Sequence, residues 1–174
     1  MKSIIDYKFS KWKKENVTIV TNEYKKESNS IVYGVVLEDG YIFDKSSDDD
    51  INYARWIENT IGGKITIKKK NSNKPSVDYD WEYNGITKQW EKKSPTTLNA
   101  ISNRIKQGYK QLSIANNPGG FFVDLNVGKL MNVEDAIDKL LFELYSKGSL
   151  LRGQTFDVIV THKRKIVVCL RINK

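Results

Sequence analysis

Acidic side chains and a lysine fall at alternating positions on the two sides of Asn84-Gly85. Asn-Gly is a strong signal for a two-residue hairpin turn, so the flanking segments should pair as antiparallel strands. The register that this turn sets places Asp78 directly opposite Glu91. Because side chains alternate between the two faces of a strand, Asp80 and Lys93 share the face of these carboxylates.

This cluster of charges predicts a cation site. Opposed carboxylates destabilise a sheet unless a positive charge lies between them. Two or three carboxylates with room for water form a ligand set that suits Mg²⁺ or Mn²⁺. Lys93 is suited to orient or deprotonate a water molecule, or to stabilise charge that develops on a phosphate. The alternative is a set of salt bridges on a solvated sheet face, with Lys88 and Lys92 as ordinary surface lysines.

A helix expected at about 49–61 adds one more acid. Ile51, Ala54 and Ile61 form an apolar seam at helical spacing, and Glu58 lies on the same seam. A carboxylate on a buried face is costly unless it is paired or binds a metal. We therefore expect Glu58 to point at the site beneath the helix. The alternative is a bond to a lysine or to a backbone amide at the helix edge.

Helical and strand patterns alternate along the rest of the chain, which predicts an α/β domain with a mixed central sheet and flanking helices. We expect the carboxylate hairpin at the centre of the sheet, with the helices at 49–61 and 98–112 near its carboxylate face. The remaining elements expected are a helix at 133–147 and strands at 64–70, 77–83, 86–93, 121–125, 156–161 and 165–172.

Residues 1–47 are expected to lie outside the domain formed by 48–174. They are polar and rich in lysine, which is typical of an extension or linker. A strand is expected near 17–20. Asp39-Gly40 predicts a hairpin between 31–37 and 41–43.

Composition limits the classes of function. The chain has 174 residues and a net charge of +8, and its pI near 9.4 favours a polyanionic partner such as nucleic acid. With Cys169 and His162 as the single residues of their kinds, intrachain disulfides and zinc sites built from thiolates or several histidines are excluded. No apolar run of about 18 residues occurs, so no membrane anchor is expected in this chain.

Several polar residues outside the hairpin are candidates for substrate contacts. Gln111 shares a helical side with Arg104, where it can bond a site carboxylate or the substrate backbone. His162 is expected to be an exposed turn residue, and Cys169 a buried and inert one. The candidate phosphate contacts are Lys68, Lys69, Lys70, Arg104, Lys106 and Lys110.

The hairpin and the segments around it resemble the PD-(D/E)XK nuclease motif. The form that they resemble is the C-terminal nuclease domain of contact-dependent growth inhibition (CDI) and related polymorphic toxins. Asp78-Tyr79-Asp80-Trp81, Gly85 and Trp90-Glu91-Lys92-Lys93-Ser94-Pro95 carry the motif. Residues 54–63, 106–111 and 117–124 resemble the acid-bearing helix, the end of the next helix and the strand after it.

The resemblance implies a restriction-endonuclease-like core and metal-dependent phosphodiester cleavage, commonly of tRNA. The implied metal is Mg²⁺ or Mn²⁺, with Zn²⁺ as an alternative, and its ligands are Asp78, Glu91 and Glu58. Asp80, Lys93 and Gln111 complete the implied catalytic set, and the hairpin register favours Asp78 over Asp80 as the family's aspartate.

The resemblance also implies a partner and a place of action. The implied toxin is delivered from a secreted or cell-surface parent protein, acts in the target-cell cytoplasm and is neutralised by a cognate immunity protein. Two other classes of function stay open. One is a DNA-cleaving nuclease of the same fold, and the other is a nucleic-acid-binding module without catalysis.

Overall fold

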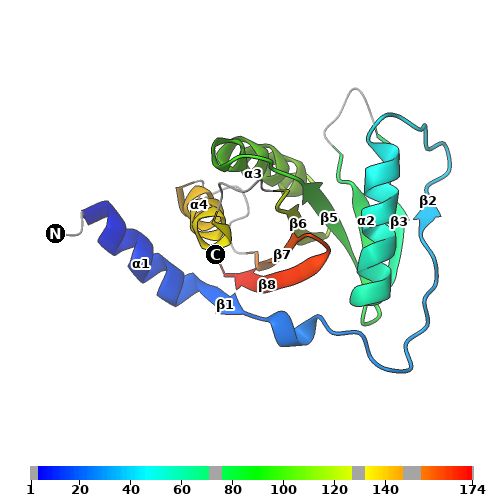
Figure 1. Cartoon of the computed structure of the whole chain (residues 1–174), viewed down its shortest axis with the longest axis horizontal. Helices are drawn as coiled ribbons and strands as arrows, with labels where there is room; N and C mark the ends of the chain where they lie inside the picture. Colours follow the sequence, from blue (N-terminus) through cyan, green and yellow to red (C-terminus); the bar gives the residue numbers. More distant parts are fainter. Residues whose placement is uncertain (1–3, 71–75, 127–131, 147–153, 174) are drawn as a thin grey trace.

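The computed structural model describes residues 4–70, 76–126, 132–146 and 154–173, and in these ranges eight strands form one mixed sheet flanked by helices (Figure 1). The helices are α1 (Ile4–Asn16), α2 (Ser47–Thr60), α3 (Leu98–Ser113) and α4 (Val133–Ser146). The strands are β1 (Val17–Ile19), β2 (Val36–Leu37), β3 (Lys64–Ile67), β4 (Tyr79–Tyr83), β5 (Ile86–Lys93), β6 (Pro118–Asp124), β7 (Phe156–His162) and β8 (Lys165–Ile172).

The strand order across the sheet is β1-β8-β7-β6-β5-β4-β3-β2. Strands β3, β4 and β5 form an antiparallel meander, and β5, β6 and β7 run parallel to one another. The hairpin of β4 and β5 therefore lies inside the sheet, as expected. Because β5, β6 and β7 are parallel, their carboxyl ends lie at the same edge of the sheet.

Apolar cores form on both faces of the sheet. The core beneath α3 and α4 includes Ile105, Leu140 and Phe121. The core beneath α2 includes Ile57, Trp81 and Phe122. Phe121 and Phe122 are neighbours on β6 that point to opposite faces, as strand alternation requires. The sheet is thus a central layer covered on both sides.

The α2 helix lies on the face of the sheet opposite to the one that we expected. Trp90 of β5 packs in the core beneath α2, whereas its neighbour Glu91 pairs with Phe121, whose side chain packs beneath α3. Of the two helices expected near the carboxylate face, α3 is there, and α2 is not. The large apolar surface of Tyr79, Trp81 and Trp90 decides this, because it can be buried only against an apolar helix face.

Most element boundaries agree with those expected from the sequence to within two residues, and two boundaries differ by three. Strand β3 ends at Ile67, three residues early, and β6 begins at Pro118, three residues early. Gly119 and Gly120 precede the strand expected at 121–125, but they lie in β6. A Cβ on Gly119 would lie 2.3 Å from Trp90 Nε1, and a Cβ on Gly120 would lie 1.8 Å from a backbone oxygen of β7. Glycine is therefore required for β6 to approach its neighbours.

The first 47 residues contribute to both edges of the sheet. The strand expected near 17–20 is β1, which pairs with β8. The hairpin expected around Asp39-Gly40 is not formed, because β2 pairs in parallel with β3 and residues 41–43 form no strand. A turn does occur at this place, where the Tyr41 amide donates to the Glu38 carbonyl at 3.0 Å.

Helix α1 lies in the segment that was expected to be an extension or linker. Phe9 and Trp12 on one of its faces contact the rings of Phe142 and Tyr145 on α4. Lys13 adds an ion pair with Asp138 at 3.3 Å. Packing against α4 thus stabilises a segment whose composition resembles a linker. No helix in the described ranges is both long and apolar enough to cross a membrane.

Candidate functional site

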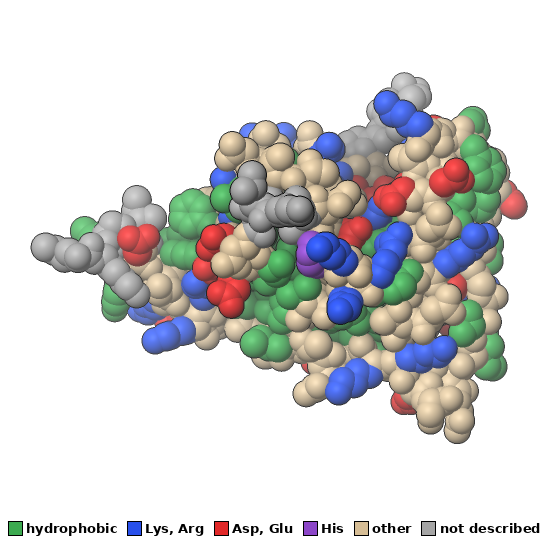
Figure 2. Space-filling view, in the orientation of Figure 1, with side chains coloured by type: hydrophobic (Ala, Val, Ile, Leu, Met, Phe, Trp, Pro, Cys, Tyr) green, Lys and Arg blue, Asp and Glu red, His purple; other side chains and the backbone are tan. Residues whose placement is uncertain are grey.

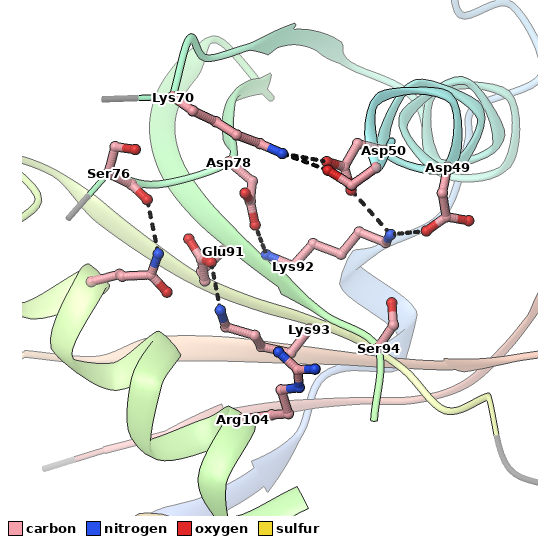
Figure 3. Close-up of a pocket in the computed structure, with 12 residues that line it drawn as sticks. Asp49, Asp50, Lys70, Ser76, Asp78, Glu91, Lys92, Lys93, Ser94 and Arg104 are labelled. Atoms are coloured by element: carbon pink, nitrogen blue, oxygen red, sulfur yellow. Dashed lines mark hydrogen bonds and ion pairs between the residues drawn. The ribbon is translucent and has the colours of Figure 1, made fainter. Parts of the chain in front are cut away.

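Acidic side chains gather over the middle of the molecule with lysine and arginine side chains beside them, as Figure 2 shows. The acids and bases that concern the predicted site lie around the carboxyl end of β5. A cavity of about 500 Å³ opens there (Figure 3). Its walls are Ser46, Asp49, Asp50, Lys70, Ser76, Asp78, Glu91, Lys92, Lys93, Ser94, Arg104 and Gln111.

Glu91 and Lys93 occupy the face of β5 that is turned toward α3. Glu91 is 1% exposed, and the Lys93 ammonium lies 3.0 Å from Glu91 Oε1. The second carboxylate oxygen of Glu91, Oε2, is buried and has no hydrogen-bond partner among the described residues. A carboxylate group with one paired and one unpaired oxygen therefore faces the cavity.

Asp78 lies beside Glu91, as the hairpin register predicts. The register is confirmed, since Tyr79 pairs with Trp90 and Tyr83 pairs with Ile86. Asp78 Oδ2 accepts a hydrogen bond of 2.8 Å from the backbone amide of Lys92, which fixes this carboxylate at the head of β4.

The pKa of Glu91 is raised above its ordinary value, first because burial penalises the charged form. The nearby charge of Asp78 raises the pKa further, whereas Lys93 opposes the shift. Two acids that share one small space in this way favour either a shared proton or a bound cation.

Gly108 of α3 leaves room for Lys93. A Cβ at this position would lie 3.1 Å from Lys93 Cε and 2.7 Å from Phe121 Cε1. Helix α3 can therefore pass close over β5 while the lysine still extends to Glu91.

The alternative interpretation of the hairpin made Lys92 an ordinary surface lysine, and for this residue that alternative is wrong. Its side chain is 4% exposed and points to the opposite face of β5, toward α2. There the ammonium forms ion pairs with Asp49 and with Asp50, the latter at 3.3 Å. Lys88, nearer the turn, is exposed as expected.

The acids that α2 contributes to the cavity are Asp49 and Asp50, from its first turn. Asp50 has an ion pair with Lys70 at 3.9 Å in addition to its contact with Lys92. Burial raises the pKa of Asp50, the Lys92 charge opposes that shift, and the charge of Asp78 adds to it. Neither acid belongs to the set of site residues predicted from the sequence. The sequence signal for them was strand alternation, which places Lys92 on the face of β5 opposite to Glu91 and so toward α2.

Glu58 does not reach the cavity. It lies in the second half of α2, where its Oε1 accepts a hydrogen bond of 3.2 Å from the backbone amide of Ile65. The expectation that Glu58 points at the site is therefore wrong, and the alternative of a backbone amide partner is confirmed. Burial raises the pKa of Glu58, and the Ile65 amide opposes the shift.

Asp80 is also separate from the cavity. Its carboxylate pairs with Lys68 at 3.2 Å, and Lys68 also contacts Glu38 at 3.3 Å. These groups form a half-buried ion-pair network that joins the hairpin to the residues that follow β2 and β3. Of the two aspartates considered, Asp78 is the one that lines the cavity.

Gln111 reaches the site from α3. Its Nε2 donates to the Ser76 carbonyl at 3.1 Å, while its Oε1 is buried without a partner among the described residues. The hydroxyl of Ser94, which follows Lys93 in the motif, is likewise buried without a partner among the described residues. Gln111 Oε1, Ser94 Oγ and Glu91 Oε2 are thus buried oxygen atoms on the wall of one cavity.

The candidate phosphate contacts separate into three groups. Lys70 and Arg104 line the cavity. Lys68 and Lys69 line an adjacent hollow of about 270 Å³, which shares Ser76 and Gln111 with the cavity. The remaining candidates, Lys106 and Lys110, are exposed on α3 and line neither.

The carboxylates of the cavity suit a hard cation that keeps most of its water better than a cation bound entirely by protein side chains. Among the described residues, no group of three or more His, Cys, Asp or Glu side chains is arranged to hold a metal ion. The predicted set of three carboxylates is therefore not assembled, and Asp78 and Glu91 remain. Mg²⁺ commonly binds through one or two carboxylates and keeps several waters. The unpaired Glu91 Oε2 and the volume of the cavity suit that mode of binding.

Comparisons with protein family models, with curated proteins and with solved structures find no match to this chain. The residues of the cavity therefore carry the functional proposal.

Proposed function

We propose that this chain is a metal-dependent endonuclease that cleaves phosphodiester bonds in RNA, with tRNA as the favoured substrate. The observation that carries the proposal is the grouping of Asp78, Glu91 and Lys93 at the wall of a cavity. Their face of the hairpin is occupied by charges where a soluble domain ordinarily buries apolar groups.

The chain's own residues have distinct parts in this reaction. A divalent cation at Asp78 and Glu91 would supply an activated water and neutralise phosphate charge. The ammonium of Lys93 is held beside Glu91, where it can donate to a phosphate oxygen as negative charge develops. Lys70 and Arg104 can hold phosphates at the cavity wall.

Ion pairs within the cavity support a site that is organised before substrate arrives. Lys92 is anchored between Asp49 and Asp50 behind β5, so the strand end that carries Glu91 and Lys93 is tied to α2. Groups held in place in this way need little reorganisation during the reaction. The unpaired Gln111 Oε1 can accept a hydrogen bond from a water or from a substrate hydroxyl.

The order of the elements also supports the proposal. Helix α2 is followed by the meander β3-β4-β5, then by α3, and then by β6 parallel to β5. This is the order that the sequence resemblance led us to expect, and a PD-(D/E)XK core is part of the same proposal.

The preference for RNA rests on the resemblance together with the basic character of the chain. A net charge of +8 attracts any nucleic acid. A folded RNA presents phosphates and 2′-hydroxyls that a small domain can recognise by shape. Neutralisation by an immunity protein and delivery into a target cell belong to the proposal through the resemblance alone.

The decisive experiment compares Lys93→Ala with Lys88→Ala. Both lysines lie on β5, but only Lys93 lines the cavity. Purified wild type should cleave total tRNA in Mg²⁺ or Mn²⁺ and lose this activity in EDTA. Lys88→Ala should remain active, and Lys93→Ala should not cleave.

Three outcomes would contradict the proposal. Nicked plasmid beside intact tRNA would make the protein a DNA nuclease. Binding without cleavage of either substrate would make it a binding module. Equal cleavage by Lys93→Ala and Lys88→Ala would place the reaction outside this cavity.

A further inference from the structure

The turn between β7 and β8 consists of two residues with an unusual backbone. Lys163 and Arg164 have φ angles of 50° and 55°, in the left-handed region. The hairpin of β4 and β5 places Asn84 and Gly85 in the same kind of turn, with φ angles of 51° and 76°. Asn-Gly is the preferred pair for such turns, whereas long side chains are disfavoured there. The cost of Lys163 and Arg164 in these positions points to a role for their side chains.

Both side chains are exposed, and Arg164 is held in place by aromatic rings. Its Cζ lies 5.3 Å from the ring centre of Tyr53 and 5.8 Å from that of Trp56, both on α2. A guanidinium group on an aromatic face keeps the N–H groups at its edge available for donation. Neither Lys163 nor Arg164 forms an ion pair within the described ranges.

The turn lies near the cavity, on the same edge of the sheet. The turn follows the carboxyl end of β7. In the sheet β7 lies beside β6, and β6 lies beside β5, and all three strands run in the same direction. The cavity residue Lys92 has its ammonium 5.1 Å from the ring centre of the same Tyr53. Since both distances end at one ring centre, the charges of Lys92 and Arg164 are at most about 10 Å apart.

Hydrogen bonds fix the turn and the cavity relative to each other. The Tyr53 hydroxyl and Thr161 Oγ1, near the end of β7, are 2.8 Å apart, and Thr161 Oγ1 also donates to Asp124 on β6 at 2.9 Å. The Tyr53 ring is therefore a buried link between α2 and the end of β7 rather than a mobile surface group.

We propose that Lys163 and Arg164 bind phosphates of the same nucleic-acid strand whose scissile bond lies in the cavity. This inference rests on the proposed nuclease function. A strand in a duplex rises about 3.4 Å per nucleotide, so the span of at most about 10 Å between the charges of Arg164 and Lys92 corresponds to no more than about three nucleotides. The turn would then hold the substrate beside the wall of the cavity that Lys92 and the first turn of α2 form. An acidic protein segment is the competing partner, but it gives no reason for the cations to adjoin the cavity.

The test replaces the turn with the residues of the other hairpin. Lys163→Asn/Arg164→Gly removes two charges and suits the left-handed turn. The control, Lys8→Ala/Lys14→Ala, removes the same charge from exposed positions on α1. Binding of fluorescein-labelled total tRNA is measured by anisotropy in EDTA at several salt concentrations, so that no cleavage interferes.

The turn variant should bind tRNA about 10- to 100-fold more weakly, and its slope of log K against log salt should be shallower by about 1.5. The control should lose less than about threefold, because it changes only the net charge. Thermal unfolding should show no loss of Tm in the turn variant. If Tm falls, Lys163→Asn alone, which keeps Arg164 on its aromatic rings, should still weaken binding and reduce the slope.

Equal binding by the turn variant and the control would overturn the inference. A loss of binding to poly-glutamate but not to tRNA would overturn it in favour of an acidic protein partner. Cleavage by wild type is scored separately. Turn-dependent binding without cleavage would support phosphate binding by Lys163 and Arg164 while contradicting the proposed function. Cleavage with turn-independent binding would support the proposed function and overturn the inference.

Discussion

Glu58 and Glu91 are alike in most properties that mark a functional carboxylate. Each is 1% exposed, and each has an Oε2 without a hydrogen-bond partner among the described residues. Burial raises the pKa of both. On burial and unpaired oxygen alone, the two glutamates are equal candidates for a metal ligand.

Their surroundings separate them. Glu91 has Asp78 and Lys93 beside it and lies on the wall of a cavity. Glu58 bonds a backbone amide and belongs to an apolar part of α2. A buried and unpaired carboxylate oxygen therefore indicates a site only where there is also space for a ligand and a second charge to act with.

The largest expected difference between the two glutamates is in catalysis. Glu91→Gln should reduce the rate of tRNA cleavage by about 10³-fold or more, because it removes a charged group from the reaction centre. Glu58→Gln should stay within about threefold of wild type, since an amide oxygen can still accept the Ile65 bond. Initial rates on a gel in Mg²⁺ or Mn²⁺ measure both. Equal losses in the two variants would remove the distinction drawn from the cavity.

The second largest difference between Glu91 and Glu58 should be in metal binding. At a Mn²⁺ concentration about 100 times Kd, a bound ion stabilises the native state by about 2.7 kcal/mol. For a domain of this size that corresponds to a rise in Tm of about 5–10 °C. Wild type and Glu58→Gln should show the rise, whereas Glu91→Gln should not, because a neutral amide is a poor ligand for a hard cation.

Differential scanning calorimetry with and without Mn²⁺ measures this shift. A shift of the same size in Glu91→Gln would mean that the ion binds elsewhere, and the ion pair of Glu91 with Lys93 would then be structural.

A third difference between the two glutamates is that Glu91 has Lys93 beside it. A substitution at Gly108 tests whether the position of Lys93 matters for cleavage. Gly108→Ala places a Cβ against Lys93 and Phe121. Overpacking of this kind costs about 1–3 kcal/mol, and the better helix propensity of alanine offsets about 1 kcal/mol. We expect cleavage to fall by about tenfold as Lys93 is displaced.

Asn103→Ala, at an exposed position of the same helix, is the matched control and should retain full activity. Chemical denaturation measures the stability of both variants. Unchanged cleavage by a folded Gly108→Ala would show that the position of Lys93 is not critical.

The smallest effect concerns pH in the protein without metal. The pKa of Glu91 in the folded state lies above its value of 4.5 in the unfolded state. Between these two values the folded state holds the proton more tightly, so its contribution to stability is lost as pH rises. The stability of wild type relative to Glu91→Gln should therefore fall between about pH 5 and pH 8.

Glu58→Gln should show a difference of the same sign, because the pKa of Glu58 is raised as well. Addition of Mn²⁺ at pH 8 should then make wild type more stable than Glu91→Gln, which reverses the sign of that stability difference. The difference between wild type and Glu58→Gln should not change. Urea denaturation at three pH values measures both, and the absence of any reversal would contradict a cation at Glu91.

The core of the site could be predicted from the sequence because it depends on local geometry. The Asn84-Gly85 turn determines the register of β4 and β5, and the register places Asp78 beside Glu91. Strand alternation then directs Lys93 to the same face. Likewise, Thr97 and the apolar stripe behind it predict α3, whose first turn Thr97 caps by accepting a bond of 3.1 Å from the Ala100 amide.

Tertiary packing decided the rest. A helical pattern identifies the buried side of α2, but not the face of the sheet that it covers. That choice followed from the bulk of Trp81 and Trp90, and it excluded Glu58 while bringing Asp49 and Asp50 to the cavity. Helix α1 depends in the same way on α4, which lies more than a hundred residues later in the chain. Spacing along the chain determines which residues share a face, whereas the burial of the whole apolar surface determines which faces meet.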